Sequence, residues 1–466
     1  MVKTVKFFRT AVIAAALAAA LCVTAYADEP TQFVSGTSVN GLGIGGMSVG
    51  EAKSHLEGFY DSNYKLTIKK KNGTEEYIKG SDFGYKVTVP EGLSAILDQQ
   101  NATGRVSGPA TDNSHTIQMS VVYDEGALDA AIAALSCLSG SDIVTTQDAR
   151  LSAFEAGKEF TIIPEVEGND LDIQKTTAVI KAAVAAGQTE VNLKDSGCYN
   201  EVKLRAGDES MTALRDMMNR YRNMTVTYTI GESTETLGGE TICSWLSLNG
   251  DNQVEINPQG VAGFVQAMAE KYGTSGKVRT FKTVDGRELP LTGPYGWKVN
   301  QAEEIQALTE FLKSTDSQTR ELSFSQTAAA RGDADWGSTY VEIDLAGQHV
   351  YMFQEGSLVW EAPCVTGNVS KNYTTPEGIY GLTYKEKDRI LRGAKKADGT
   401  YEYESHVDYW MPFNGGIGLH DANWRGNFGG SIFQNSGSHG CVNLPPKKVP
   451  ALYDMVFKGM PVICHN

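Results

Sequence analysis

Residues 340–353 read YVEIDLAGQHVYMF, and this stretch decides how the last part of the chain folds. Val341 and Ile343 alternate with Glu342 and Asp344, an Ala-Gly pair then supplies a turn, and an apolar run returns. A period of two places alternate side chains on opposite faces of a strand. The stretch therefore predicts a β-hairpin that buries one face.

The same reading continues towards the C-terminus. Turn residues at 355–356 and 375–378 precede apolar runs at 358–365 and 379–383, which predict further strands of a meander. Late in the chain, Val449, Leu452, Tyr453 and Val456 lie at helical spacing, with Gly459 expected to close that helix. Residues 338–466 are thus predicted to form a mostly β, sandwich-like domain with one late helix.

Two polar segments adjoin these strands. Residues 385–404 are charged and predict an exposed excursion or lid. Before the β domain, the composition shifts to Ser, Ala, Gly and Asp, which predicts a linker at 326–337.

Upstream of that linker, two blocks follow a similar order. Each block opens with a hairpin pattern, around Leu66 in the first and Val226 in the second. Each continues with an amphipathic helix, at about 124–138 and 257–271, and then with an extended segment, a turn and another helix. We interpret them as one α+β unit present twice, at 28–205 and 206–325.

The first residues predict export. Lys3, Lys6 and Arg9 precede an apolar run, and Ala-Tyr-Ala at 25–27 resembles a signal-peptidase site. Residues 1–27 are therefore predicted to be a signal peptide, with an uncleaved membrane anchor as the alternative. Either reading predicts an extracytoplasmic protein.

Composition narrows the choice of partner. The 466 residues carry a formal net charge of −15, which argues against nucleic acid as a partner. The chain has seven cysteines, one of them in the predicted signal segment, and the other six fit no disulfide framework. They are expected to be buried thiols or to include one structural bridge.

The richest chemistry lies between residues 415 and 443. Cys441 follows Gly440 in a predicted tight turn, and His420 follows a strand-like Gly-Ile-Gly-Leu run. A cysteine nucleophile needs a nearby base, usually a histidine, and backbone N–H groups that can stabilise an oxyanion. Asp421 lies beside His420 and could orient its ring. These residues predict a thiol–imidazole pair.

The residues by themselves leave two alternatives open. A lone cysteine in a glycine turn is commonly structural. His420, His439 and Cys441 are also zinc-type ligands, although their spacing matches no common zinc pattern.

The hexapeptide Ser-His-Gly-Cys-Val-Asn at 438–443 resembles the signature of the L,D-transpeptidase (YkuD-type) catalytic domain. The resemblance covers 338–464 and includes TTPEGIY at 374–380, GIGLHDANWR at 416–425 and GMPVIC at 459–464. The two upstream blocks resemble, more weakly, the peptidoglycan-binding domains that precede this catalytic domain in some relatives.

The resemblance implies a role for each residue of the signature. Cys441 is the expected nucleophile and His420 the proton acceptor and donor, with His439 beside the thiol. The backbone amides of Gly440 and Cys441, with that of His439, are expected to form the oxyanion hole. Supporting roles are expected for residues that brace the turn or position His420; these are Ser438, Asn443 and Asp421.

The resemblance further implies cross-linking of peptidoglycan stem peptides without a metal or organic cofactor. Carbapenem-type β-lactams are expected to acylate the same cysteine. Two alternatives stay open: an L,D-carboxypeptidase that uses water as the acceptor, and a wall-binding scaffold that has lost catalysis.

Overall fold

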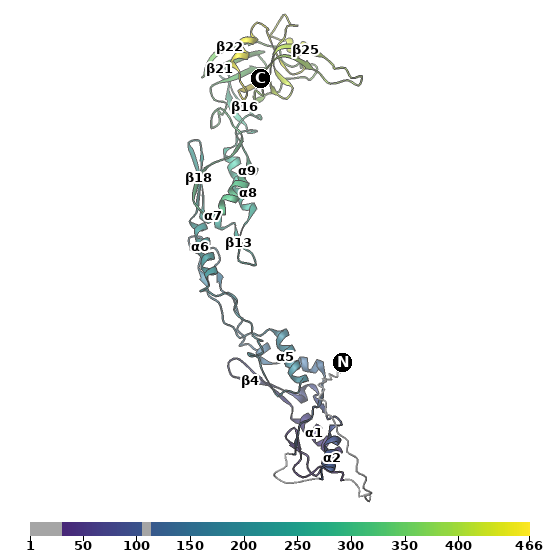
Figure 1. Cartoon of the computed structure of the whole chain (residues 1–466). Coiled ribbons are helices and arrows are strands. Elements are labelled where there is room, and N and C mark those ends of the chain that lie inside the picture. The colour runs from purple at the N-terminus through teal and green to yellow at the C-terminus, as the bar shows by residue number, and fades with distance from the viewer. Residues whose placement is uncertain (1–29, 105–112) are drawn as a thin grey trace. The chain divides into compact units, whose positions relative to one another are not determined.

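The computed structural model describes residues 30–104 and 113–466 (Figure 1). The predicted signal peptide or anchor at 1–27 lies outside the described residues. The chain divides into two compact units, one of residues 1–152 and 161–213 and the other of residues 153–160 and 214–466. Within the described ranges, no helix is both long and apolar enough to cross a membrane.

The first unit is an α+β assembly built around a three-stranded sheet of order β10-β3-β4, in which β10 runs parallel to β3. Its elements are β1 Ser38–Val39, β2 Leu42–Gly43, α1 Val49–Asn63, β3 Lys65–Lys69, β4 Glu75–Lys79, the 3₁₀ turn η1 Gly80–Phe83, β5 Lys86–Thr88, α2 Gly92–Ala102, β6 Ser114–His115, β7 Ser120–Val122, α3 Glu125–Ala133, α4 Ser136–Ser139, β8 Arg150–Leu151, β9 Ile162–Ile163, α5 Ile173–Ala185 and β10 Glu190–Asn192. The predicted hairpin is present, and Leu66 and Ile68 of β3 are buried.

One prediction for this unit is wrong in detail. The helix expected at 124–138 breaks into α3 and α4, because the chain leaves the helical conformation at Leu135. The short α4 restarts where the Glu76 carboxylate accepts hydrogen bonds from the backbone N–H groups of Ser136 and Cys137.

The first part of the second unit has a similar series of elements. They are α6 Glu209–Asn223, which begins in the preceding unit, β11 Thr225–Ile230, β12 Ser233–Gly238, α7 Gly239–Cys243, β13 Leu246–Leu248, β14 Val254–Ile256, α8 Pro258–Tyr272, β15 Arg279–Lys282, β16 Glu288–Leu291, β17 Lys298–Val299, α9 Gln301–Leu312, β18 Gln318–Glu321 and β19 Phe324–Gln326. The β11–β12 hairpin is joined by a parallel β18, just as β3–β4 is joined by β10. The helix predicted at about 257–271 is present as α8, with Asn257 as its N-cap and Gly273 after its end.

The C-terminal part of the second unit is rich in strands. Its elements are β20 Tyr340–Asp344, β21 His349–Gln354, β22 Ser357–Pro363, β23 Gly378–Gly381, β24 Glu386–Arg392, β25 Glu404–Asn414, β26 Ile417–Asp421, α10 Ile432–Ser436, β27 Val442–Leu444, α11 Val449–Met455 and β28 Pro461–His465. A five-stranded sheet of order β22-β21-β20-β28-β23 and a four-stranded sheet of order β24-β25-β26-β27 contribute to one hydrophobic core. Val341 and Ile343 point into that core, as their alternation predicts. The prediction that only one face is buried is wrong, because Glu342 on the other face is also buried and pairs with His465 Nε2 at 3.0 Å.

Two details of this region differ from the prediction. The short helix α10 precedes the signature hexapeptide and was not expected. The late helix α11 ends at Met455, so Gly459, with a φ of 89°, turns the chain into β28 and does not close the helix.

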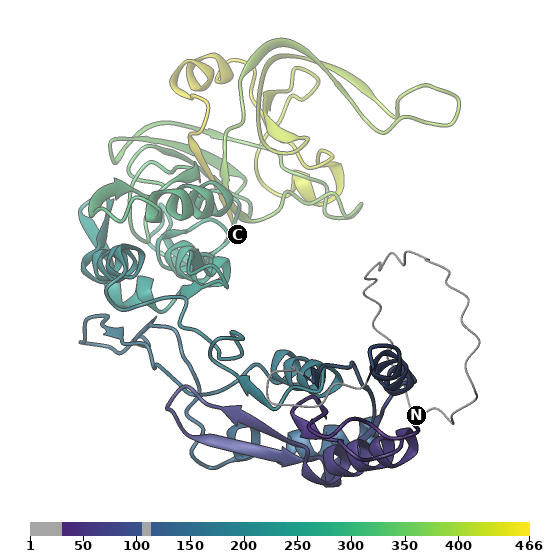
Figure 2. The same ribbon diagram turned by 60° about the horizontal axis from the view of Figure 1, so that its bottom comes forward.

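The segment predicted as a lid is the β24–β25 hairpin. Most of its side chains are exposed, and its tip extends away from the rest of the domain (Figure 2). The residues on either side of its turn, where Leu391 pairs with Ser405, reach the pocket described below.

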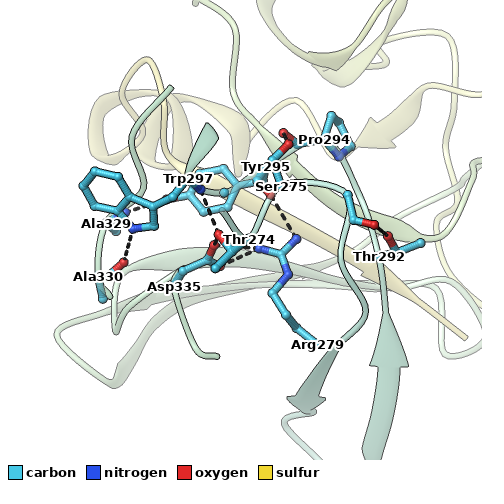
Figure 3. A network of polar contacts seen from close by, with 12 residues as sticks. Thr274, Ser275, Arg279, Thr292, Pro294, Tyr295, Trp297, Ala329, Ala330 and Asp335 are labelled. Carbon is cyan, nitrogen blue, oxygen red and sulfur yellow. Dashed lines mark hydrogen bonds and ion pairs between the residues drawn. The ribbon is translucent and has the colours of Figure 1, made fainter. Parts of the chain in front are cut away.

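In the segment predicted as a linker, residues 327, 329 and 331–334 are exposed, and only two residues near its end are buried. Asp335 and Trp336 are buried. Arg279 Nη1 lies 2.6 and 2.7 Å from the carboxylate oxygens of Asp335, and its Nη2 donates to the Tyr295 carbonyl at 2.9 Å (Figure 3). Thr274 also donates to Asp335. A buried ion pair therefore holds the end of this segment in place.

The same region attaches the α+β part of this unit to the β-rich part. Phe281 and Leu291 of the β15–β16 hairpin pack with Ile379 and Ile463 in a second hydrophobic cluster. A Cβ at Gly293 would lie 2.2 Å from the Ile379 carbonyl oxygen, so only glycine permits this approach.

All six cysteines of the described residues are free thiols. The structure therefore contains no disulfide bridge in the ranges that it describes.

Candidate active site

Two neighbouring strands position the predicted pair. Strands β26 and β27 run parallel, with His420 opposite Asn443, and Cys441 is the residue immediately before β27. Both side chains line one pocket of about 250 Å³. The lining residues are Leu391, Tyr403, Ser405, His420, Trp424, Arg425, Gly437, Ser438, His439, Cys441 and Asn443.

The turn before Cys441 is held from both sides. Ser438 Oγ donates to the Cys441 carbonyl at 2.5 Å and accepts from the Gly440 N–H at 3.0 Å. Gly440 has a φ of 115°, a backbone conformation that residues other than glycine rarely adopt. The buried Thr375 hydroxyl donates to the Gly440 carbonyl at 2.6 Å and accepts from the Gly367 N–H at 3.1 Å. These bonds hold the cysteine at the edge of the pocket.

The thiol of Cys441 rests in its neutral form. Its Sγ lies 3.5 Å from the Gly416 carbonyl oxygen, to which it donates. Burial raises the pKa of the thiol to about 11, and a contact with the Gly418 backbone opposes this only in part. A neutral thiol is a poor nucleophile, so the proton must leave when a substrate is attacked.

His420 can accept that proton. Its Nδ1 lies 2.8 Å from the Asp421 carbonyl oxygen. A carbonyl can only accept, so Nδ1 carries the hydrogen and Nε2 keeps its lone pair. Burial also lowers the pKa of His420, which keeps the ring neutral. Trp410 and Trp424 lie beside the ring, with centroids 5.9 and 5.8 Å from its own.

Asp421 does not orient the ring through its carboxylate, as the sequence suggested. Its Oδ1 accepts the Tyr409 N–H at 2.8 Å, and the side chain is buried away from the pocket lining. The backbone carbonyl of Asp421 positions His420 instead. Residue spacing cannot distinguish these two groups of one residue.

The amide of Gly440 is already engaged, because it donates to Ser438 Oγ. This weakens its predicted role in an oxyanion hole. The N–H groups of His439 and Cys441 have no acceptor among the described residues, so they are the better candidates.

His439 lies between two aromatic rings. Tyr373 and Tyr403 each place their ring centroid 4.6 Å from the imidazole. Tyr403 belongs to the polar segment that was predicted as a lid, so His439 connects the catalytic turn to that segment.

Sequence reasoning did not identify Thr375, Tyr373 or Tyr403. Thr375 stands in the TTPEGIY stretch, whose resemblance to the family was the only signal for it. Neither tyrosine carried a signal, because only the fold brings it to the turn.

The zinc alternative finds no support in the geometry. Among the described residues, no three His, Cys, Asp or Glu side chains are placed to hold a metal ion.

Comparisons with known proteins identify two domains in the chain. A family model described as "L,D-transpeptidase catalytic domain" (YkuD) matches residues 338–464, and one described as "Putative peptidoglycan binding domain" matches residues 93–192. No curated protein matches the chain.

Three solved structures illustrate the similarity. The Ldtfm-avibactam carbamoyl enzyme is 32% identical, over 55% of this chain and 99% of its own, with a TM-score of 0.45. A cysteine-to-serine mutant of the Enterococcus faecium L,D-transpeptidase is also 32% identical, over 54% and 98%, with a TM-score of 0.44. The ertapenem-acylated catalytic domain from E. faecium is 40% identical, over 28% and 98%, with a TM-score of 0.25.

The family model covers the whole β-rich part of the chain, and two relatives above 30% identity are covered almost to their full length. The two matched domains imply an enzyme that acts on the cell wall, outside the cytoplasm. The chain therefore belongs to the L,D-transpeptidase family and is an enzyme of that type, with its YkuD catalytic domain at residues 338–464.

Proposed function

We propose that this enzyme joins two peptidoglycan stem peptides through a Cys441 thioester. The donor is a tetrapeptide stem, and the bond that breaks joins its third residue to the terminal D-alanine. The observation that carries the proposal is that Cys441 and His420, from neighbouring parallel strands, line one pocket.

In the first half-reaction, Cys441 Sγ attacks the carbonyl carbon of the third stem residue. The thiol proton passes to Nε2 of His420, which has its lone pair available. The amides of His439 and Cys441 are the donors proposed for the oxyanion. When the C–N bond breaks, His420 returns the proton to the leaving amine, and D-alanine departs.

In the second half-reaction, the side-chain amine of a second stem attacks the thioester. His420 takes a proton from that amine, the C–S bond breaks, and the cysteine sulfur regains the proton. A cross-link between two third residues results. Water must be kept from the thioester for this outcome to prevail over hydrolysis.

The part of the β24–β25 hairpin next to its turn, where Leu391 pairs with Ser405, is our candidate for excluding water. Leu391, Tyr403 and Ser405 come from this segment and line the pocket. Tyr403 also packs on His439 beside the cysteine. The exposed tip of the hairpin takes no part in this proposal.

Two relatives support covalent chemistry with acylating inhibitors, one of which is a carbapenem. One is described as an avibactam carbamoyl enzyme, and the other as a catalytic domain acylated by ertapenem. We propose that carbapenem-type compounds acylate Cys441 here.

The upstream α+β parts are proposed to be two copies of one wall-binding unit. The support is their shared order of elements and the parallel strand that completes each hairpin sheet. The divisions at 28–205, 206–325, 326–337 and 338–466 remain predictions, as does export by the segment at 1–27.

Two alternatives compete. An L,D-carboxypeptidase would use the same residues with water as the acceptor. A silent scaffold would bind wall without turnover, although the presence of both Cys441 and His420 argues against it.

Incubation with a tetrapeptide muropeptide separates the three possibilities. Mass spectrometry should find a cross-linked dimer together with free D-alanine. A product consisting only of the trimmed tripeptide would favour the carboxypeptidase, and no change at all would favour the scaffold.

Cys441→Ala should abolish both turnover and the mass increase produced by ertapenem. Cys137→Ala is the matched control, because Cys137 is the other half-buried cysteine of the described residues. His420→Ala should lose most turnover. Full acylation of the Cys441→Ala protein would disprove the proposed nucleophile.

A further inference from the structure

Arg425 is a cation without a counter-charge in the candidate active site. Its Nη1 donates to the Ser436 carbonyl at 2.7 Å, and its buried Nε has no partner among the described residues. It forms no ion pair with a described carboxylate, and no Asp or Glu lines the pocket. A half-buried cation that lacks an anionic partner is costly unless a ligand supplies one.

Arg425 lines the same pocket as Cys441 and His420. Trp424 lies next to it in the chain and has its ring centroid 5.8 Å from that of His420. Burial lowers the pKa of His420, the backbone hydrogen bond and the negative charge of Asp421 raise it, and the positive charge of Arg425 lowers it, so Arg425 and His420 are close enough to interact.

Stereochemistry then relates Arg425 to the donor. In the proposed reaction, the amine of the departing D-alanine must meet His420. The carboxylate of that residue is attached to the same Cα as the amine, so it must lie within a few ångströms of the imidazole.

We propose that Arg425 is a specificity residue, which binds the terminal carboxylate of the donor's departing D-residue in the pocket of Cys441 and His420. This inference rests on the proposed function. The inference extends the proposed function, because it assigns recognition of the donor's free carboxyl end to the side chain of Arg425. A guanidinium matches a carboxylate in geometry and charge.

Binding of the carboxylate would also act on His420. It neutralises the charge of Arg425, which removes one cause of the lowered pKa of the imidazole. The ring then holds a proton more readily at the stage where the leaving amine needs one.

The experiment compares three donors with wild-type enzyme. The first is a disaccharide-tetrapeptide with a free terminal carboxylate, the second has its terminal D-alanine amidated, and the third has only the α-carboxylate of its second residue amidated. Release of the terminal residue is followed by mass spectrometry. Wild type should prefer the free acid to the terminal amide by about 10- to 100-fold in kcat/KM, the range of a charge-assisted hydrogen bond.

Arg425→Gln should reduce that preference to nearly one, by slowing the free acid and leaving the terminal amide almost unchanged. Arg425→Lys should keep part of the preference. Lys458→Gln is the matched control, because it removes an exposed positive charge of the same domain outside the pocket. Labelling of Cys441 by iodoacetamide checks that the site of each variant remains intact.

Three results would overturn the assignment. They are a wild type that does not distinguish acid from amide, a variant that slows both donors equally, and an Arg425-dependent effect on the third donor. If the wild-type enzyme released no terminal residue from any donor, the proposed function itself would be wrong. That result differs from a wild type that releases the residue but does not prefer the free acid over the terminal amide.

Discussion

The reactive groups of this enzyme are both neutral at rest. Burial raises the pKa of Cys441 to about 11 and lowers the pKa of His420. Desolvation disfavours the charged form of each group, and the two effects together oppose a thiolate–imidazolium pair. In the proposed mechanism, proton transfer is therefore coupled to attack on the substrate and does not precede it.

This resting state predicts the pH dependence of the reaction. His420 must be neutral to accept a proton, and its lowered pKa means that it becomes protonated only below the ordinary value of about 6.5. The kcat/KM for D-alanine release should rise with pH along a limb below pH 6.5 and stay level through neutral pH. Circular dichroism at each pH controls for unfolding. An acid limb centred above 6.5 would contradict the assignment of His420 as the base.

At the scale of elements, the segment that leads into β23 supports the catalytic turn. Thr375 is buried and joins Gly367 to Gly440 through its hydroxyl. Its hydrogen bond to the carbonyl before Cys441 makes it a positioning residue, because it acts on the cysteine through the backbone.

Thr375→Val keeps the shape of the side chain and removes both hydrogen bonds. We expect kcat/KM to fall roughly tenfold to a hundredfold, through kcat more than KM, since buried unpaired groups cost about 1–3 kcal/mol. Thr375→Ser should restore most of the activity. If Thr375→Val lowered the melting temperature and left kcat unchanged, the role would be structural only.

The β24–β25 hairpin is the second element that acts on the site. Tyr403→Ala removes the ring that packs on His439 and opens the pocket lining. More water should then reach the thioester, and the ratio of trimmed tripeptide to cross-linked dimer should increase several-fold. Tyr401→Ala is the control, because Tyr401 lies near the exposed tip of the same hairpin and does not line the pocket. An unchanged product ratio would remove the hairpin from the mechanism.

At the scale of the whole molecule, a buried ion pair anchors the end of the segment before the catalytic domain. Arg279 and Asp335 are 4% and 0% exposed, so neither charge has water as an alternative partner. Burial raises the pKa of Asp335, and Arg279 opposes that change. Removing one partner leaves the other charge buried and uncompensated.

Asp335→Ala should therefore destabilise the unit of residues 214–466 by about 3–5 kcal/mol. All six tryptophans of the chain lie between residues 245 and 424, so their fluorescence during urea unfolding reports on this unit. Asp333→Ala, two residues away and exposed, should have little effect. Equal destabilisation by the two variants would show that the ion pair contributes nothing specific.

Elements that depend on interactions between residues close in sequence were predicted correctly. The alternation at Val341 and Ile343, the hairpin around Leu66 and the helix at about 257–271 all depend on nearby residues, and the structure confirms them. The break in the helix at Leu135 was missed, because the contacts from Glu76 that favour a restart come from a distant strand.

The sequence by itself determined the strand-rich class of the last domain, its family and the identity of Cys441 and His420 as the reactive candidates. Tertiary structure alone decided the partners of the buried polar groups. The Asp421 carboxylate accepts a hydrogen bond from the Tyr409 N–H, the Gly440 N–H donates to Ser438, and Asp335 is buried. The physical reason is the distance along the chain over which each kind of interaction acts. Propensity and periodicity act within a few residues, whereas the partner of a buried polar group is chosen by elements that meet only after the chain has folded.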